Sequence, residues 1–419
     1  MSSFLAPILL FKNAAVAPLL VSRIISSASV GFGQIALTWG VLAMEYGPRD
    51  LSIVLACNAF PALLIVFGGL VGDRYRRHHV LITAELLACG SWIALGTAFW
   101  TGDAPLTVVC LFAAMGGIAT ALFMPTLRGI VADLLRSDDR PAGNALVNQT
   151  QSVGLLVGLV SSGVVVTVIG PAWAAAARGI LCGISALVLS RLSTPRPTLT
   201  RTGFVTDMRV GWREFVRYPW VWIMTLQYMA VTTALMCYAK IAGPLYANDG
   251  NGGAYAWGII SAAEPLGALA GALIGARRKP GRGVIATALL PTSAAAPMAL
   301  MSGGAPWPTI ALAALLPGTL LAIYYVRWTT TLQEQFPSHV LIRVNSWNII
   351  ASYSIMPLSL VLSGPIVAHL GPQAIALASA MLTIVATLLT LLILRPVAHK
   401  PTELPVIARK TLPSSGDRR

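Results

Sequence analysis

Five ionisable side chains interrupt long apolar stretches of this sequence: Arg23, Glu85, Arg178, Lys240 and Glu264. A charge in such a stretch is costly to bury, so each one predicts either an ion pair or a function. Glu264 lies about nine residues into its stretch, or ~13 Å along a helix at about 1.5 Å per residue. A carboxyl group buried at this depth is a candidate proton carrier.

The other four charges have more than one interpretation. Arg23, Arg178 and Lys240 are candidates for proton coupling or substrate contact. The alternative for each is a buried salt bridge, or a side chain that reaches water near a helix end. Lys240 and Glu264 lie in consecutive apolar stretches and could pair, whereas Glu85 is more readily interpreted as a structural partner.

The sequence lacks the motifs that position catalytic or cofactor-binding groups. It contains no GxGxxG opening a helix, no P-loop GxxxxGK[ST], no HExxH and no GxSxG. Its five cysteines show no CxxC spacing, which argues against a zinc site or a disulfide framework. We therefore expect no enzymatic activity, cofactor or metal, and no ATP bound by this chain as an energy source.

The composition indicates that these charges lie within membrane-spanning helices. Of 419 residues, 56% are hydrophobic and only 11% are charged, whereas soluble domains carry about a quarter. Apolar stretches of about 20 residues, enough to cross ~30 Å of hydrocarbon, recur along the chain. The sequence thus predicts an all-α integral membrane protein with twelve transmembrane helices, at residues 15–44, 51–72, 79–100, 104–125, 144–169, 171–191, 219–246, 254–276, 283–302, 306–326, 344–369 and 372–394.

The net charge of +14 could indicate a nucleic-acid partner, but its distribution indicates a membrane topology. With these spans, 25 of the 29 lysines and arginines fall on one side, and the other four are Arg23, Arg49, Arg178 and Lys240. Basic residues gather in cytoplasmic loops. We therefore expect both termini in the cytoplasm and a lipid bilayer, not nucleic acid, as the partner.

The chain also contains an internal repeat. The pattern of residues 68–82, GGLVGDRYRRHHVLI, recurs at 271–285 as GALIGARRKPGRGVI, and Asp133 after the fourth span corresponds to Glu334 after the tenth. Such parallel repeats are typical of one large transporter class. The expected organisation is a six-helix bundle at 1–191, a cytoplasmic linker with an amphipathic helix at 192–218, a second bundle at 219–396 and a disordered tail at 397–419.

The edge of the second span, Gly69-x-x-x-Asp73-Arg74-x-x-Arg77, resembles motif A of the major facilitator superfamily. Segments such as PTLRGIVADLLRSDDRPAGNALVN and VGWREFVRYP make the chain similar to its bacterial efflux branch, the macrolide- and enterobactin-exporter-like group. The resemblance implies two pseudo-symmetric six-helix bundles. Arg76 and His78 depart from the motif, and the sequence offers no physical account of them.

The resemblance also implies a gate on the cytoplasmic side. Asp73 would face the start of the eleventh helix, where a carboxylate gains roughly 0.3–2 kcal/mol from the helix dipole. Arg77 would pair with Asp133, in the loop expected after the fourth span. Small residues let helices approach closely, and the gating candidates are Gly69, Gly72, Asp73, Arg74, Arg77 and Asp133. The alternative for the bases is simple anchoring of the turn in the cytoplasm.

In this family the central cavity lies between helices 1, 4, 7 and 10. The residues that the resemblance places as candidates for its lining are Gln34, Trp39, Phe123, Gln227, Tyr228, Tyr324 and Tyr325. For each aromatic residue, packing or contact with lipid is the alternative. A stripe of small and polar residues in the fifth span, which includes Gly158 and Ser162, predicts a helix-packing interface.

Together these features predict a secondary active exporter in a bacterial cytoplasmic membrane. It would move a small organic molecule, such as a drug, siderophore or secondary metabolite, by alternating access. The proton is the expected coupling ion, and a monomer the expected state. The alternatives are an importer or facilitator of a small solute, and a transport-inactive sensor or scaffold on the same fold.

Overall fold

The structure is a computed structural model. It describes residues 16–64, 75–135, 139–194, 212–213, 215–277, 283–336, 341, 347–348 and 355–398. Within these ranges every regular element is a helix, and ten helices are long and apolar enough to span a membrane. They are Ala17–Ala43, Arg77–Thr101, Leu106–Val131, Ala142–Ile169, Pro171–Leu189, Pro219–Asn248, Gly253–Gly275, Val284–Ser302, Trp307–Gln335 and Pro372–Leu394.

Ten of the twelve expected spans therefore coincide with such helices. The expected second span corresponds to α3 (Pro48–Ala59) and the short η1 (Phe60–Leu64), and its remainder lies outside the described residues. The expected eleventh span corresponds in part to α17 (Met356–Leu370), a shorter apolar helix.

The spanning helices are bounded by residues that favour helix starts and ends. Proline occupies the first turn of α8 (Pro171–Leu189) and α10 (Pro219–Cys237), where its missing N–H costs nothing. Gly102, with φ of 75°, ends α5 (Arg77–Thr101) in the left-handed conformation that glycine adopts without strain. Between these ends the helices are apolar on all sides, as expected where one face packs and the other meets lipid.

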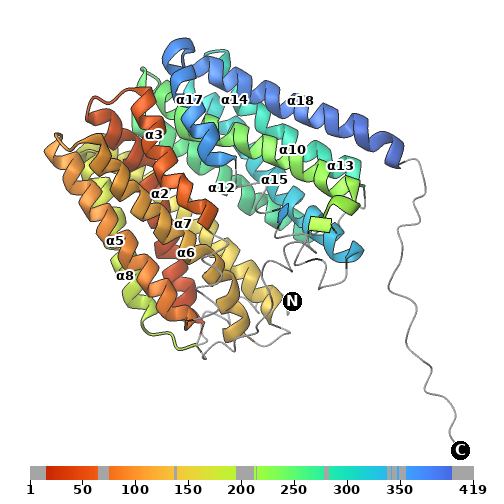
Figure 1. The fold of residues 1–419 in the computed structure, drawn as a ribbon, viewed down its shortest axis with the longest axis horizontal. Helices are drawn as coiled ribbons and strands as arrows, with labels where there is room; N and C mark the ends of the chain where they lie inside the picture. Colours follow the sequence, from red (N-terminus) through yellow and green to blue (C-terminus); the bar gives the residue numbers. More distant parts are fainter. Residues whose placement is uncertain are drawn as a thin grey trace, which may run out of the picture.

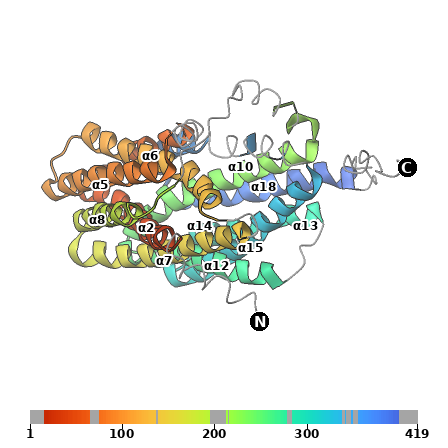
Figure 2. The ribbon, with the colours of Figure 1, turned by 90° about the horizontal axis from the view of Figure 1, so that it is seen from below.

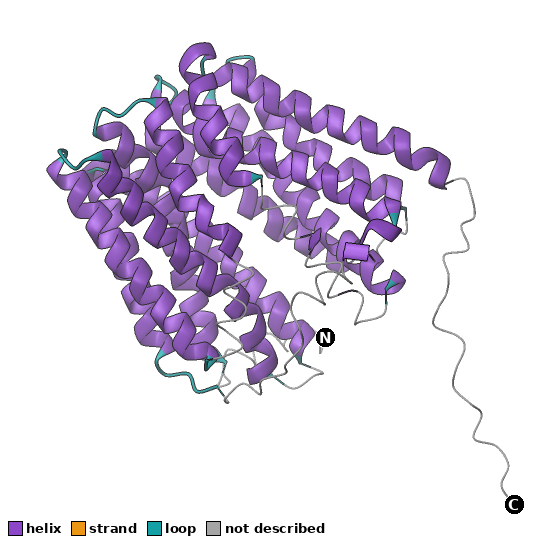
Figure 3. Ribbon diagram, viewed as in Figure 1, coloured by secondary structure: helices purple, strands orange, loops and turns teal. Residues whose placement is uncertain are grey.

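The helices form two groups, which diverge in a V (Figure 1). The first contains α2 (Ala17–Ala43), α3, α5, α6 (Leu106–Leu134), α7 (Arg140–Ile169) and α8. The second contains α10, η2 (Tyr238–Ala242), α11 (Gly243–Asn248), α12 (Gly253–Arg277), α13 (Val284–Leu289), η3 (Leu290–Ala294), α14 (Ala295–Ser302), α15 (Trp307–Gln335), α17 and α18 (Pro372–Ala398). Figures 2 and 3 show the same all-helical arrangement from below and by element type.

The hydrophobic core explains this shape. We call the end of the molecule where α2 begins the Ala17 end, and the end where α2 stops the Ala43 end. At the Ala43 end a single core cluster joins both groups, with Leu51 and Leu159 from the first and Trp257 from the second. At the Ala17 end each group has a core of its own.

Close helix contacts between the groups are also found toward the Ala43 end. A Cβ at Gly258 of α12 would meet the backbone carbonyl oxygen of Leu159 on α7 at 2.8 Å. Gly364 of α17 packs against the side chain of Ser52 on α3. Only glycine allows backbones to approach this closely.

Two expectations about the Ala17 end need correction. The loops expected after the fourth and tenth spans are helical, because α6 continues to Leu134 and α15 to Gln335. The segment around Asp133 keeps an apolar helical face, and Ile130 and Val131 are buried there. His78 is explained as well: it is buried, and its Nδ1 accepts a hydrogen bond from the backbone N–H of Thr194 at 3.1 Å.

Candidate functional site

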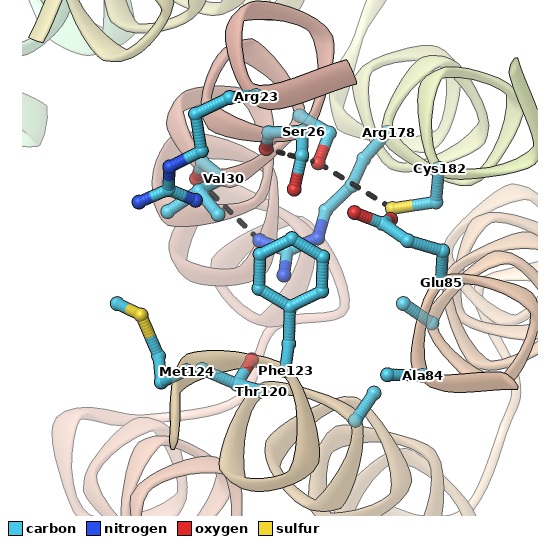
Figure 4. Close-up of a pocket in the computed structure, with 13 residues that line it drawn as sticks. Arg23, Ser26, Val30, Ala84, Glu85, Thr120, Phe123, Met124, Arg178 and Cys182 are labelled. Carbon is cyan, nitrogen blue, oxygen red and sulfur yellow. Dashed lines mark hydrogen bonds between the residues drawn. The ribbon is translucent and has the colours of Figure 1, made fainter. Parts of the chain in front are cut away.

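A pocket lies inside the first group of helices, between α2, α5, α6 and α8 (Figure 4). We call it the Arg23 pocket. It combines three ionisable residues, small polar residues and an apolar wall. Its lining consists of Arg23, Ser26, Ser29, Val30, Ala84, Glu85, Ala88, Ala119, Thr120, Phe123, Met124, Arg178 and Cys182.

Arg178 is held from several sides. Its guanidinium lies 3.9 Å from the ring centroid of Trp92, a favourable cation–π geometry. Its Nη1 donates a long hydrogen bond of 3.4 Å to the carbonyl oxygen of Val30 on α2. Gly33 leaves room for this side chain, because a Cβ there would overlap the guanidinium. These contacts fix Arg178 between α2 and α5.

Glu85 is the only acid in this lining. It is 3% exposed, and its Oε1 accepts a hydrogen bond of 3.1 Å from the Ser185 hydroxyl. It lies within electrostatic reach of both Arg178 and Arg23, although neither forms an ion pair with it within 4 Å in the described part of the chain. In Figure 4 the Glu85 carboxylate and the Arg178 side chain lie together beside Cys182.

Arg23 has the fewest protein partners of the three. Its guanidinium lies 5.7 Å from the ring centroid of Phe123. Its side chain is 3% exposed, yet within the described residues it donates no hydrogen bond, and its Nε is buried without a partner. The Nε of Arg178 is likewise buried and unpartnered. The pocket therefore offers unused guanidinium donors.

The charges of the second group are arranged differently. The side chain of Glu264 on α12 is open to water although protein surrounds it densely, so the expected depth is confirmed and the expected exclusion of water is wrong. The backbone of Glu264 packs closely against α15 at Gly318. Lys240 is half-buried in η2, a single π-helical turn, a distortion that is frequent at functional sites.

Lys240 connects the two sets of charges. It lies within electrostatic reach of Glu264 on α12 and of Arg178 on α8. Lys240 and Glu264 form no ion pair within 4 Å in the region the structure describes. Because Glu264 is exposed and also close to Lys240, its carboxyl group is open to water and to a neighbouring cation.

The predicted cavity residues fall into different environments. Tyr324 is buried and stacks on Tyr228, with ring centroids 5.5 Å apart, whereas Tyr325 is exposed. Gln227 is buried, and its Nε2 donates to the Ala288 carbonyl oxygen at 2.6 Å, so that α10 is joined to α13.

In the first group, Trp39 belongs to the core shared at the Ala43 end, and Gln34 is half-buried. Phe123 lines the Arg23 pocket. The cavity candidates thus do not form one cluster.

Of the predicted gating residues, Arg77 and Asp133 are described and lie in contact. The Nη1 of Arg77 donates to the Asp133 carboxylate at 2.7 Å and to the Gly129 carbonyl oxygen at 2.8 Å. This pair joins the start of α5 to the end of α6. The other gating candidates, Gly69, Gly72, Asp73 and Arg74, lie outside the described residues.

From the sequence, Glu85 is interpreted as a structural partner and is not placed in a site with Arg23 and Arg178. The depth of the three residues along their helices could have indicated that they lie together. Counted from the Ala17 end, Arg23, Glu85 and Arg178 lie about 6, 8 and 11 residues into their helices, or roughly 9–16 Å at about 1.5 Å per residue. Three ionisable groups at similar depth in one bundle predict a common site. The described residues contain no group of three or more metal-ligating side chains, and the five cysteines are free.

Comparison with known proteins identifies the family. The family model of the Major Facilitator Superfamily matches residues 3–357. The chain belongs to the major facilitator superfamily. Members of this superfamily are membrane transporters, and the chain is accordingly a multi-pass membrane transporter.

Curated relatives and solved structures agree with this assignment. The enterobactin exporter EntS of Escherichia coli K12 is 25% identical over 399 residues, covering 93% of this chain and 94% of the exporter. The EntS of Salmonella choleraesuis is 25% identical over 395 residues, covering 92% and 94%.

Among solved structures, the nucleoside transporter NupG matches with a TM-score of 0.72 at 12% identity, covering 91% of this chain and 99% of its own. A bacterial homologue of the human lysosomal transporter Spinster, in an inward-facing and unoccupied conformation, matches with a TM-score of 0.62 at 15% identity, covering 91% and 95%. At these sequence identities, the two structural matches support the fold alone.

Proposed function

We propose that this transporter exports a small organic molecule by alternating access, coupled to inward flow of protons. The observation that carries the proposal is the division of the core. The two groups of helices share a core at the Ala43 end and have separate cores at the Ala17 end. Packed cores switch between discrete arrangements rather than deforming continuously. Two such groups can therefore rock about the shared contact.

The orientation follows from the charge distribution. With twelve spans and both termini in the cytoplasm, as the basic residues favour, the Ala17 end faces the cytoplasm. This conformation would then receive cargo from inside the cell. EntS, by its name, exports enterobactin, and the similarity to it supports export of a siderophore, drug or secondary metabolite by a monomer in the bacterial cytoplasmic membrane.

The gate would be built at the Ala17 end. The Arg77–Asp133 pair holds α5 and α6 together within the first group. When the Ala17 end closes, Asp73 would meet the start of the eleventh helix, with Gly69, Gly72 and Arg74 completing the turn. The pair then keeps the edge of the first group rigid in both conformations.

Coupling would depend on Glu264. Its exposed carboxyl group can exchange a proton with water, and Lys240 lies within electrostatic reach of it. Opening toward the outside would load the proton, and opening toward the cytoplasm would release it. Rocking of the two groups would change the access of water to this side chain.

Flux in everted membrane vesicles tests the proposal. We expect a triscatecholate siderophore or a macrolide to accumulate inside such vesicles when the membrane is energised, and a protonophore to abolish accumulation. Uptake into right-side-out vesicles instead would indicate an importer. A folded protein that transports neither in either direction would favour a sensor or scaffold.

The role of Glu264 has its own test. In Glu264→Gln we expect proton-driven accumulation to fall by about tenfold, within the range of coupling between sites. The matched control is Asp103→Asn, which removes an exposed carboxylate in the loop between α5 and α6. Unchanged dependence on the proton gradient in Glu264→Gln would remove Glu264 from the coupling mechanism.

A further inference from the structure

The Arg23 pocket contains more positive than negative charge. Two arginines, each more than nine-tenths buried, share it with the single carboxylate of Glu85. An uncompensated charge inside a membrane protein is costly and is normally paired. Glu85 can neutralise one of the two guanidinium groups, so one positive charge remains for a ligand to balance.

The contacts indicate which of the two arginines has guanidinium donors that no protein group uses. Arg178 stacks on Trp92, donates to Val30 and lies close to Glu85. Arg23 contacts the face of Phe123 and, among the described residues, donates no hydrogen bond. The free donors of the pocket therefore belong mainly to Arg23.

Two of the three hydroxyl groups that line the pocket, those of Ser29 and Thr120, do not compete for a ligand as donors. Ser29 donates to the carbonyl oxygen of Ser26 at 2.7 Å, and Thr120 donates to that of Gly116 at 3.1 Å. Both hydroxyl hydrogens are thus used within their own helices. A ligand in this pocket meets a guanidinium group rather than a set of neutral donors, which favours an anion.

The remaining wall defines the rest of the ligand. Phe123, Met124, Ala84, Ala88 and Ala119 present apolar and aromatic surface. The cavity holds only about 40 Å³, enough for an anionic group but not for a ring. The ring of a ligand would therefore lie at the open edge of the pocket, where Thr120 and Met124 are exposed beside Phe123. The favoured ligand is therefore an anionic group attached to an aromatic ring.

We propose that Arg23 binds the carboxylate or phenolate group of an aromatic cargo in this pocket. The assignment deepens the proposed export function and rests on it for the term cargo. Trp92 and Val30 hold Arg178 in place, and Ser185 holds Glu85. Phe123 packs against the ring of the ligand. The anionic group would lie within the first group of helices, and the ring would lie outside the small cavity at its open edge.

Binding to the purified full-length protein in neutral detergent tests this assignment. The probes are 2-naphthoate and its neutral amide, 2-naphthamide, measured by isothermal titration calorimetry. We expect naphthoate to bind the wild type more tightly than the amide, and to bind Arg23→Gln at least about tenfold more weakly, the equivalent of one charge-assisted hydrogen bond. The amide should bind both proteins equally.

Two further variants control for charge and folding. Arg49→Gln removes an exposed arginine on α3 and should leave both affinities unchanged. Arg23→Lys keeps the charge without the forked guanidinium geometry, so naphthoate should bind with intermediate affinity that falls as salt is added. If Arg23→Gln does not fold, the lysine variant still tests the assignment.

Several results would overturn it. These are equal affinities for naphthoate and naphthamide, no binding of naphthoate, or wild-type affinity in Arg23→Gln and Arg23→Lys. An anionic lipid headgroup offers the same chemistry, so the titration is repeated in nanodiscs of phosphatidylcholine with and without phosphatidylglycerol. Loss of naphthoate binding with phosphatidylglycerol would assign the pocket to lipid rather than to cargo.

The outcome is separable from that of the export proposal. Arg23-dependent binding of naphthoate without flux in vesicles would contradict export and leave an anion site. Proton-driven flux without a difference between naphthoate and its amide would support export and remove the anion site.

Discussion

The two groups of helices treat their ionisable residues in opposite ways. In the first group, Glu85 and Arg178 are buried, held by Ser185, Trp92 and the backbone of α2. In the second group, Glu264 is exposed and Lys240 half-buried. Burial fixes the position of a charge and exposure lets it exchange protons. If the two proposals hold, the first group would bind the cargo and the second would carry the coupling proton.

The packing of α2 accounts for the enclosed state of the first group. Gly154 and Gly158 of α7 lie directly against carbonyl oxygens of α2, at Ile24 and Ala28. Ser162, one turn further, donates to the Phe32 carbonyl oxygen at 3.1 Å. The stripe predicted in the fifth span is therefore a contact between α7 and α2, and it holds α2 over the Arg23 pocket.

The same substitution in each group gives the sharpest test of the contrast. Glu85→Gln leaves two buried arginines without a carboxylate, and we expect it to lower the free energy of unfolding by about 3 kcal/mol, typical of breaking a buried pair. Glu264→Gln, at an exposed site, should change it by less than about 0.5 kcal/mol. Thermal melting of the purified proteins measures both.

Similar melting temperatures for the two variants would contradict the contrast, since both charges would then be in equivalent environments. An anion that binds the Arg23 pocket should partly restore Glu85→Gln, because it replaces the missing negative charge. No such restoration is expected for Glu264→Gln.

A smaller effect should follow from loosening α2. In Gly158→Ala the added Cβ meets the backbone of Ala28, so α2 and α7 must move apart at a cost of about 1–3 kcal/mol. Gly90→Ala is the control, because Gly90 of α5 has nothing within 4 Å of its Cβ position. Thermal melting compares the two, and alkylation of the buried Cys182 by a maleimide reports opening.

If Gly158→Ala melts like Gly90→Ala, close packing of α2 does not enclose the first group. Faster alkylation of Cys182 without a change in melting temperature would instead place the opening at the pocket alone.

Much of the fold follows from the sequence because its spans need only apolar length. The positions of ten helices could be predicted, although α6 and α15 continue beyond their expected ends. The family could also be predicted, since motif A and the charge distribution are local patterns. The environment of Glu264 could not, because it depends on how α12 packs against α15, for example at Gly318, and on where the rest of the second group leaves access to water. The contact between His78 and Thr194 also joins residues far apart in sequence.

The candidate site could be predicted only in part, because single unusual residues are visible in the sequence but contacts between distant helices are not. Arg23 and Arg178 were predicted one at a time, as charges in apolar stretches, and Phe123 as a cavity candidate that the resemblance implies. Their meeting with Glu85 depends on the packing of four helices. A sequence pattern of period 3.6 shows which face of a helix is apolar, but it does not show which faces of different helices meet.

The smallest expected effect concerns the internal repeat at the Ala17 end. Asp133 of the first group pairs with Arg77, and both side chains are little more than a fifth exposed. Its repeat counterpart in the second group, Glu334, is exposed and has no ion pair within the described residues. A double-mutant cycle with Arg77→Gln and Asp133→Asn should give a coupling of about 0.2–1 kcal/mol, the range for partly exposed pairs.

Glu334→Gln is the matched control and should leave stability unchanged. If Glu334→Gln destabilises the protein as much as Asp133→Asn, the two groups hold their edges alike, and the gate is symmetric. If only Asp133 couples to a base, the rigid edge belongs to the first group alone. That group would then carry both the fixed side of the gate and the enclosed pocket, and the second group would carry the exchangeable proton.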